Sequence, residues 1–215
     1  MRRMLFEKTG TAIWMSHLDT MRLMQRAFRR AGVVLHHSQG YTPHAYVSMI
    51  LPLSVGTESI CEILEYELDA EIAITPEDMN AVLPQGVHVL RVYESDRKAK
   101  FLTDLSVSLT MLYDNGVPDG AAERIEALLN SAELTVEKRT KRGMEETDIR
   151  PMIKKTAFSV ENDRITLTAL ISAQNPALNP ALLTAAIERY IPQDKPDFVR
   201  YRRLEVFEES GEIFR

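Results

Sequence analysis

The amino-acid sequence, 215 residues long, predicts an α+β protein made of two ferredoxin-like (split βαβ) halves with antiparallel sheets. Both halves show the same order of apolar periodicities, which is β-α-β, an extra extended piece, and β-α-β again. A charged stretch at residues 94–100 separates the two series and is typical of a linker. We therefore expect an N-terminal domain at residues 1–96 and a C-terminal domain at residues 97–215.

The clearest element of the first half is a helix that begins after Ser16 and ends at Gly32. Ser16 is a good N-cap, and the side chain of Asp19, three positions on, can accept hydrogen bonds from the free backbone amides of the first turn. Apolar residues at spacings of three or four form the stripe that the core is expected to bury: Leu18, Met21, Met24, Ala27, Phe28 and Ala31. The other expected elements are strands at 3–8, 33–37, 45–51, 61–70 and 87–93 and a short helix after Thr75.

The second half repeats this order. We expect strands at 101–113, 133–139, 151–160, 164–171 and 198–207, and helices at 121–129 and 181–190. The polar insert KRTKRGMEETDIR, residues 138–150, overlaps the end of the second of these strands, and the segment EKRTKRG, residues 137–143, is expected to be mobile.

The composition is that of a soluble globular protein, with 45% hydrophobic residues. No apolar run approaches the roughly 20 residues of a transmembrane helix, and the first residues lack a secretory signal, so we expect a cytoplasmic protein without a membrane partner. The single cysteine, Cys61, excludes an intrachain disulfide and any multi-thiolate metal or iron–sulfur site within this chain.

The net charge of −5 hides a strong asymmetry along the chain. Residues 1–50 hold seven Lys and Arg against two acids, whereas residues 51–96 hold one Arg against ten acids. Such a pattern lets one face attract an anion while another face keeps the molecule soluble or meets a different partner.

Four of the cations lie on the polar side of the predicted helix: Arg22, Arg26, Arg29 and Arg30. Their spacings of three and four bring them side by side, so each pair repels by about 0.2–0.5 kcal/mol. One interpretation is that nearby acids, Glu62, Glu65 or Glu67, neutralise them. The other is that they bind RNA, because the planar fork of arginine suits phosphate oxygens and stacks on exposed bases.

The long loop HSQGYTPHAYVSMILPLSVG, residues 37–56, is the second candidate contact surface, because its glycines and prolines fix turns around small polar groups. Ser38, Gln39 and His44 offer hydrogen-bonding groups, and Tyr41 and Tyr46 offer stacking faces. The alternative is a hairpin connection that packs on the core.

A second basic set lies in the C-terminal half and consists of Arg139, Lys141, Arg142, Arg150, Arg200 and Arg202. If the two halves pack side by side, this set joins the helix arginines in one groove that follows an RNA backbone. The alternative is that each charge run is a solvated surface, which the neighbouring acids of the polar insert favour.

The histidines supply only a weak catalytic candidate. His17 can act as a general base on a ribose hydroxyl, with Ser38 or Arg22 holding a phosphate, or it can simply satisfy the start of the helix. His36 and His37 are adjacent on a predicted strand and point to opposite faces, so they are poor joint metal ligands. No catalytic constellation is complete and no spacing matches a zinc site, so we expect neither a metal nor an enzyme activity in this chain.

Two stretches, SHLDTMRLMQRAFRRAG and HSQGYTPHAYVSMILPLSVG, resemble the signature of the radical-SAM-linked protein family. That bacterial family consists of uncharacterised domains fused to, or encoded beside, a radical SAM enzyme with a cobalamin-binding-like region. The matching positions are Ser16, His17, Leu18, Asp19, Arg22, Arg26, Arg29 and Arg30 in the helix and Ser38, Gln39, Gly40, Pro43 and His44 in the loop. Ala45 and Tyr46 stand where the family has Pro and Lys, so the loop lacks one cation.

The resemblance implies a radical SAM partner that carries an iron–sulfur cluster and S-adenosylmethionine, with no cofactor in this chain. The double ferredoxin-like order and the early helix are also similar, more weakly, to repeat-associated CRISPR RNA endonucleases. Those proteins bind RNA across two such domains and usually end in a glycine-rich loop, whereas the tail of this chain has only Gly211.

From the charge pattern and the resemblance, we expect an accessory protein that binds RNA rather than DNA and works with a radical SAM enzyme. The substrate would be ribosomal or transfer RNA, or the role would lie in ribosome-related metabolism. One alternative is an adaptor that docks on the radical SAM enzyme without touching RNA. Another is a metal-independent endoribonuclease that uses His17.

Overall fold

The computed structural model describes residues 1–70, 72–140 and 143–215. It divides into two compact units, Met1–Ala99 together with Arg215, and Lys100–Phe214. Among the residues described, no helix is both long enough and apolar enough to span a lipid bilayer.

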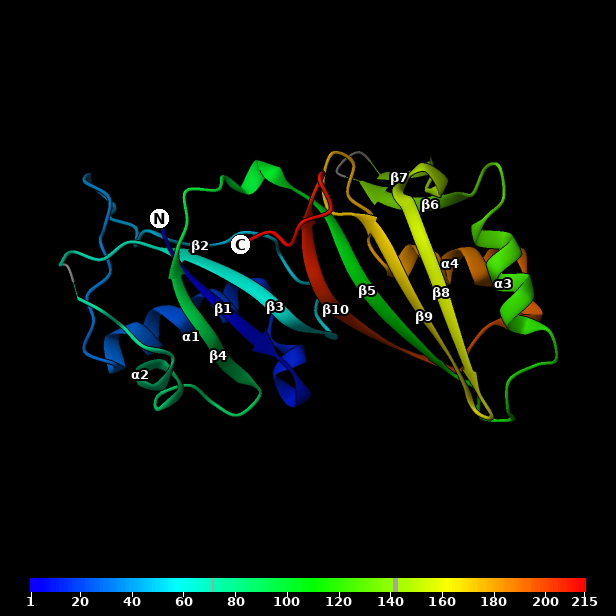
Figure 1. Ribbon diagram of the computed structural model, residues 1–215, viewed down its shortest axis with the longest axis horizontal. Coiled ribbons are helices and arrows are strands. Elements are labelled where there is room, and N and C mark those ends of the chain that lie inside the picture. Colours follow the sequence, from blue (N-terminus) through cyan, green and yellow to red (C-terminus); the bar gives the residue numbers. More distant parts are fainter. Residues whose placement is uncertain (71, 141–142) are drawn as a thin grey trace. The chain divides into compact units, whose positions relative to one another are not determined.

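The first unit has the βαββαβ order of a ferredoxin-like fold (Figure 1). Its elements are β1 (Arg2–Lys8), the 3-10 turn η1 (Gly10–Trp14), α1 (His17–Arg30), β2 (Val47–Met49), β3 (Thr57–Tyr66), α2 (Pro76–Asn80) and β4 (Val87–Glu94). β1 pairs with β3 and with β4, and β2 pairs with β3, all antiparallel. Because β1 and β2 pair with the same residues of β3, they lie on its two opposite edges, and the strand order is β4-β1-β3-β2.

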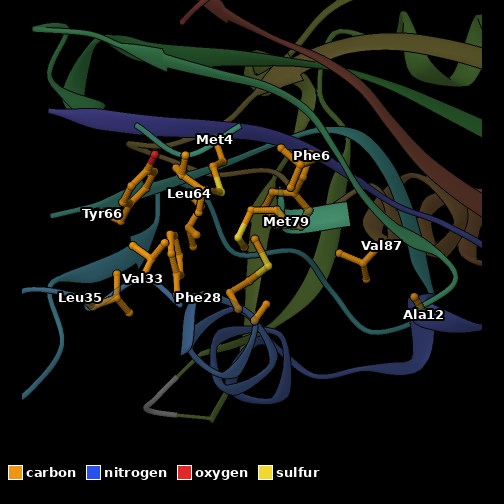
Figure 2. Close-up of a cluster of buried hydrophobic side chains, with 14 residues drawn as sticks. Met4, Phe6, Ala12, Phe28, Val33, Leu35, Leu64, Tyr66, Met79 and Val87 are labelled. Carbon is orange, nitrogen blue, oxygen red and sulfur yellow. The ribbon is translucent and has the colours of Figure 1, made fainter. Parts of the chain in front are cut away.

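The core of this unit lies between the sheet and its two helices (Figure 2). Met4 and Phe6 of β1 and Leu64 and Tyr66 of β3 alternate onto the helix-facing side and are buried. Phe28 of α1 packs against Tyr66 with the ring centroids 4.8 Å apart. Burial raises the pKa of Tyr66 to about 12, so its hydroxyl is neutral at physiological pH.

Helix α1 confirms the predicted ends but not the whole predicted apolar stripe. Met24, Ala27 and Phe28 are fully buried, whereas the side chain of Leu18 is 62% exposed. At about 100° per residue, Leu18 lies on the same side of the helix as Arg22, and not on the side of Met24. The prediction that the core buries Leu18 is therefore wrong, and this leucine belongs to the cationic face.

The predicted strand at 33–37 does not form. Leu35 makes one isolated bridge to Leu68, and His37 makes another to Ala45. Because these two residues pair with different segments, no continuous ladder develops, and the chain here is a bent connection instead.

The second unit confirms a ferredoxin-like order with one inserted hairpin (Figure 1). Its strands are β5 (Leu102–Leu112), β6 (Thr135–Thr140), β7 (Gly143–Asp148), β8 (Ile153–Glu161), β9 (Arg164–Ser172) and β10 (Phe198–Glu208). Its helices are α3 (Ala121–Leu129) and α4 (Ala181–Tyr190), with 3-10 turns η2 (Ala99–Phe101), η3 (Arg150–Met152) and η4 (Pro192–Asp194). Four strands pair antiparallel in the order β10-β5-β9-β8, which repeats the arrangement of the first unit.

The polar insert contains a strand that the sequence did not predict. Its residues from Gly143 onward form β7, which pairs with β6 as a separate ribbon. The base of the ribbon is fixed because the carboxylate of Asp148 accepts from the backbone amides of Leu134 and Arg150. The periodicity of apolar residues in a sequence does not reveal a hydrogen bond of this kind.

Candidate nucleic-acid interface

Helix α1 starts from a firmly held turn. The amide of Asp19 donates to the Ser16 hydroxyl over 3.2 Å, and that hydroxyl donates to the Asp19 carboxylate over 2.7 Å. This hydrogen bond, together with the nearby Arg22 guanidinium, holds the pKa of Asp19 below its usual range. The buried ammonium group of Lys8 donates to the carbonyl of Met15 over 2.7 Å, which fixes the residue before the cap. The predicted N-cap is thus confirmed, and it sets the direction of the helix.

The four helix arginines form an exposed line of cations, which we name the arginine row: Arg22, Arg26, Arg29 and Arg30. Arg22 lies 3.5 Å from the carboxylate of Asp19, and both side chains are more than half exposed. Arg30 donates to the carbonyl of Val82 over 2.7 Å. Within the described part of the chain, no carboxylate lies within ion-pair distance of Arg26, Arg29 or Arg30.

The acids that could have neutralised the row lie elsewhere or have other partners. Glu65 pairs with Arg3, whose guanidinium is fully buried, over 2.6 Å. Glu62 is itself buried, at 1% exposure. Across the residues that the structure describes, neither these two acids nor Glu67 forms an ion pair with the arginine row. The row therefore keeps its charge available to an external anion.

The loop that follows α1 is closed by a pair of hydrogen bonds at its base. The Ser38 amide donates to the carbonyl of His44, and the His44 amide donates to the Ser38 hydroxyl over 3.0 Å. We name residues 38–44 the clamped loop. Gln39, Tyr41 and His44 are exposed on it, so three predicted contact residues face solvent, and Ser38 holds the base of the loop.

A cavity of about 200 Å³ brings the end of α1 together with the base of the clamped loop. Its polar lining consists of Gln25, Arg29 and His37, with Val34 and Ala45 among its apolar residues. His37 Nδ1 lies 2.7 Å from the Leu35 carbonyl and therefore carries a proton, because a carbonyl only accepts. With the proton on Nδ1, the neutral ring presents Nε2 as a hydrogen-bond acceptor.

Sequence analysis missed Gln25 and His37 as members of this site. Gln25 precedes Arg29 by one helical turn, a spacing that places the two side chains on the same surface. His37 was assigned to a regular strand, and only the isolated bridge to Ala45 turns it toward α1.

The neighbouring His36 has a structural role in the described chain. Its Nδ1 lies 2.6 Å from a carboxylate oxygen of Asp69, and its ring stacks on Tyr46 with centroids 5.2 Å apart. One face of Tyr46 is therefore already covered.

The predicted basic residues of the second unit are spread over several elements. Arg200 and Arg202 are exposed on β10, on the face opposite Tyr201, whose hydroxyl hydrogen-bonds Thr184 of α4 over 2.8 Å. Arg150 begins η3, and its guanidinium donates a hydrogen bond to the carbonyl of Ile153 over 2.8 Å. Part of its hydrogen-bonding capacity is therefore used within the unit. The backbone of Arg139 belongs to β6, whereas Lys141 and Arg142 lie outside the described residues.

His17, the weak catalytic candidate, is the first residue of α1 and is half-buried. Its Nδ1 is buried without a hydrogen-bond partner among the residues described. In the same part of the chain, no group of three His, Cys, Asp or Glu side chains is arranged to hold a metal ion.

The fold and this surface define a two-unit α+β protein whose first helix carries an exposed, largely unpaired cationic face. Residues 2–180 match the family described as "Uncharacterized protein conserved in bacteria (DUF2344)", and the chain belongs to that family. No curated protein matches the sequence.

The comparison with solved structures gives matches at very low sequence identity. A chain in the "Crystal Structure of a Cbf5-Nop10-Gar1 Complex" is 10% identical, with a TM-score of 0.54 over 97% of this chain and 50% of that chain. A chain in the "Crystal structure of the archaeal box H/ACA sRNP Nop10-Cbf5 complex" is 9% identical, with a TM-score of 0.48 over 94% of this chain and 46% of that chain. The protein thus spans about half the length of these chains, and the first likeness shows the fold alone.

Proposed function

We propose that this protein binds RNA through the arginine row and the clamped loop, as an accessory partner of a radical SAM enzyme that acts on ribosomal or transfer RNA. The observation that carries the proposal is the exposure of Arg26 and Arg29 without a carboxylate partner in the described chain. Adjacent like charges on a helix cost about 0.2–0.5 kcal/mol per pair. A polyanion that lies along the row removes this cost.

The dimensions of the row suit a phosphate backbone better than a single small anion. At 1.5 Å per residue, the Cα atoms of Arg22 and Arg30 lie about 12 Å apart along the helix axis. Successive phosphates of one strand lie about 3.4 Å apart along the axis of a stacked helix and farther apart in an extended single strand, so either form places more than one phosphate along the row. The cavity at Arg29 and His37 then supplies a recess with an apolar wall and a few polar side chains at the end of the row, next to the clamped loop.

The radical SAM part of the proposal rests on the two sequence motifs of the helix and the loop. The only cysteine of the chain, Cys61, is buried, so an iron–sulfur cluster would belong to the partner. In this arrangement the present chain presents the RNA, and the partner supplies the chemistry.

Salt dependence of RNA binding tests the proposal. For single strands, the logarithm of the binding constant falls with the logarithm of salt by about 0.7 per neutralised phosphate, so four arginines predict a slope of about −3. Affinity should drop by about 50-fold between 50 and 200 mM salt. The measurement is fluorescence anisotropy of a labelled RNA, both unstructured and hairpin, titrated with the purified full chain.

Charge-removing variants make the test specific to the row. Arg26→Gln combined with Arg29→Gln should halve the slope. Arg164→Gln is the matched control, because Arg164 is half-exposed at the start of β9 and already paired with Asp163 over 2.9 Å. Equal losses in both variants, or binding that does not respond to salt, would contradict RNA binding by the row and favour the adaptor alternative.

Two further measurements address the partner and the ribonuclease alternative. Tagged protein purified from its own bacterial host should retain a radical SAM protein, identified by mass spectrometry, and its absence would refute that part of the proposal. Gel electrophoresis of RNA after incubation shows whether the chain cleaves it. Intact RNA rules out a nuclease that uses His17.

A further inference from the structure

The strongest unassigned feature is an exposed tryptophan beside the start of the arginine row. Trp14 ends η1 and has 67% of its surface exposed, although tryptophan is usually well covered in folded proteins. Leu18 follows Trp14 by four residues, and Val55 precedes Gly56, the residue against which the Trp14 ring packs. Their exposed fractions are 62% and 54%. We name Trp14, Leu18 and Val55 the tryptophan patch.

The indole ring is held on a rigid support. A Cβ atom added at Gly56 would lie 3.5 Å from Cζ3 of Trp14, so the ring packs over the backbone of Gly56. The Gly56 amide donates to the carbonyl of Ile13 over 2.9 Å, which ties η1 to the start of β3. On the other side of Trp14, the Lys8 ammonium group holds the Met15 carbonyl. The tryptophan is therefore fixed at its backbone while most of its ring faces solvent.

Two residues of the tryptophan patch, Trp14 and Leu18, come directly before the arginine row in the sequence. Leu18 follows Trp14 by four residues, which limits the separation of their Cα atoms to about 14 Å. At about 100° per residue, Leu18, Arg22, Arg26 and Arg29 fall within about 80° of one another around the helix. The exposed tryptophan therefore lies close to the end of α1 at which the arginine row begins.

We propose that Trp14 is a base-stacking residue and that the RNA bound along α1 is single-stranded, with one unpaired base on the indole ring. This inference rests on the proposed RNA binding and names the class of RNA. Aromatic rings stack on bases of any sequence, and a cationic track beside the ring follows the backbone, which is the usual design of single-strand binding surfaces. In a duplex the bases are stacked on one another and do not present a free face to a surface ring.

Trp14 is better suited to this role than the tyrosines of the loop. Tyr41 is fully exposed, with no packing to orient its ring, and Tyr46 already uses one face against His36. Stacking energy is retained best by a ring whose position is fixed before binding.

Intrinsic fluorescence tests the inference directly, because Trp14 is the only tryptophan in the chain. Unlabelled oligouridylate and oligoadenylate should quench the emission of the full-length protein over the same concentration range in which anisotropy reports binding. Inorganic polyphosphate, which carries charge but no bases, should bind without quenching. A blunt-ended RNA duplex, in which all bases are paired, should quench less than a single strand at equal occupancy.

Variants separate stacking from general loss of apolar surface. Trp14→Ala should weaken single-strand binding by about 5- to 150-fold, the range measured for one base stacked on an aromatic ring, and Trp14→Phe should restore most of the affinity. Leu90→Ala is the control, because Leu90 is exposed on β4 on the face opposite the buried Val89, and it should change nothing. Far-UV circular dichroism of each variant confirms that it is folded.

The outcomes distinguish failure of the inference from failure of RNA binding. RNA binding with unchanged emission, or with full affinity in Trp14→Ala, overturns the stacking role and assigns the patch to a protein partner. No RNA binding by the unmodified protein overturns both proposals. Quenching by polyphosphate equal to that by RNA also overturns the stacking role, because no base is then involved.

Discussion

Substitution of Arg26 by glutamine should leave the N-terminal unit at least as stable as the unmodified protein. Arg26 is exposed and forms no ion pair within the described residues, so the change breaks no salt bridge there. Glutamine and arginine have nearly equal helix propensities. The only energetic term that changes is therefore the repulsion between Arg26 and its neighbours Arg22, Arg29 and Arg30, at positions −4, +3 and +4.

The expected gain follows from the number of these pairs. Each like-charge pair costs about 0.2–0.5 kcal/mol, so removal of three pairs should raise the free energy of unfolding by about 0.5–1 kcal/mol after allowance for solvent screening. Urea unfolding followed by circular dichroism, and by the emission of Trp14 for the unit that contains α1, measures the change. The gain should be present at about 0.01 M salt and absent at about 1 M, where the Debye length falls from about 30 Å to about 3 Å.

A loss of more than about 1 kcal/mol in Arg26→Gln would refute this reasoning, because it would mean that the arginine makes a stabilising contact in the native state. A gain that persists at about 1 M salt would also refute it, since repulsion between exposed charges is screened there. Either result would remove the main support for a row of cations kept for an external anion.

Three further substitutions test other parts of the first unit. Arg3→Gln should lower the free energy of urea unfolding by about 3–5 kcal/mol, because the Glu65 carboxylate, only 13% exposed, loses its buried partner; a cost below about 1 kcal/mol would contradict this. Ser38→Ala should cost about 1 kcal/mol and speed hydrogen exchange of the His44 amide, and unchanged exchange would show that the clamped loop is held in another way. Hydrogen bonds from Thr75 hold the pKa of Asp78 below its usual 3.8, so its contribution to stability is present above that pH and is lost as the pH falls through the lower folded value. Asp78→Asn should therefore flatten the dependence of unfolding free energy on pH below about pH 4, measured by urea titrations at a series of pH values. If the variant and the unmodified protein lose the same stability over that pH range, the proposed role of the cap is wrong.

The sequence predicted those elements whose signals are local. Helix α1 was identified correctly because its N-cap Ser16 and the buried side of Met24 and Phe28 are both encoded within a few residues. The two-unit α+β fold followed from the order of periodicities, which does not depend on tertiary contacts.

The parts that sequence analysis missed depend on contacts between distant segments. His37 joins Arg29 in one cavity only because the isolated bridge to Ala45 turns the connection after α1. Trp14 lies in a 3-10 turn that no sequence pattern predicted, and its ring packs over the backbone of Gly56, far away in the sequence. Neither feature produces a periodic signal in the sequence.

The structure also refines what the charge asymmetry means. Three of the seven cations in residues 1–50 lie on β1 and are used inside the unit: Arg2 approaches Glu94, Arg3 pairs with Glu65, and Lys8 binds the Met15 carbonyl. The other four are the arginine row. The three cations of β1 therefore have partners within the unit, whereas the excess positive charge of residues 1–50 lies on one exposed face of α1. Because a protein of net negative charge gains no stability from that concentration, an external polyanion is the simplest physical reason for it.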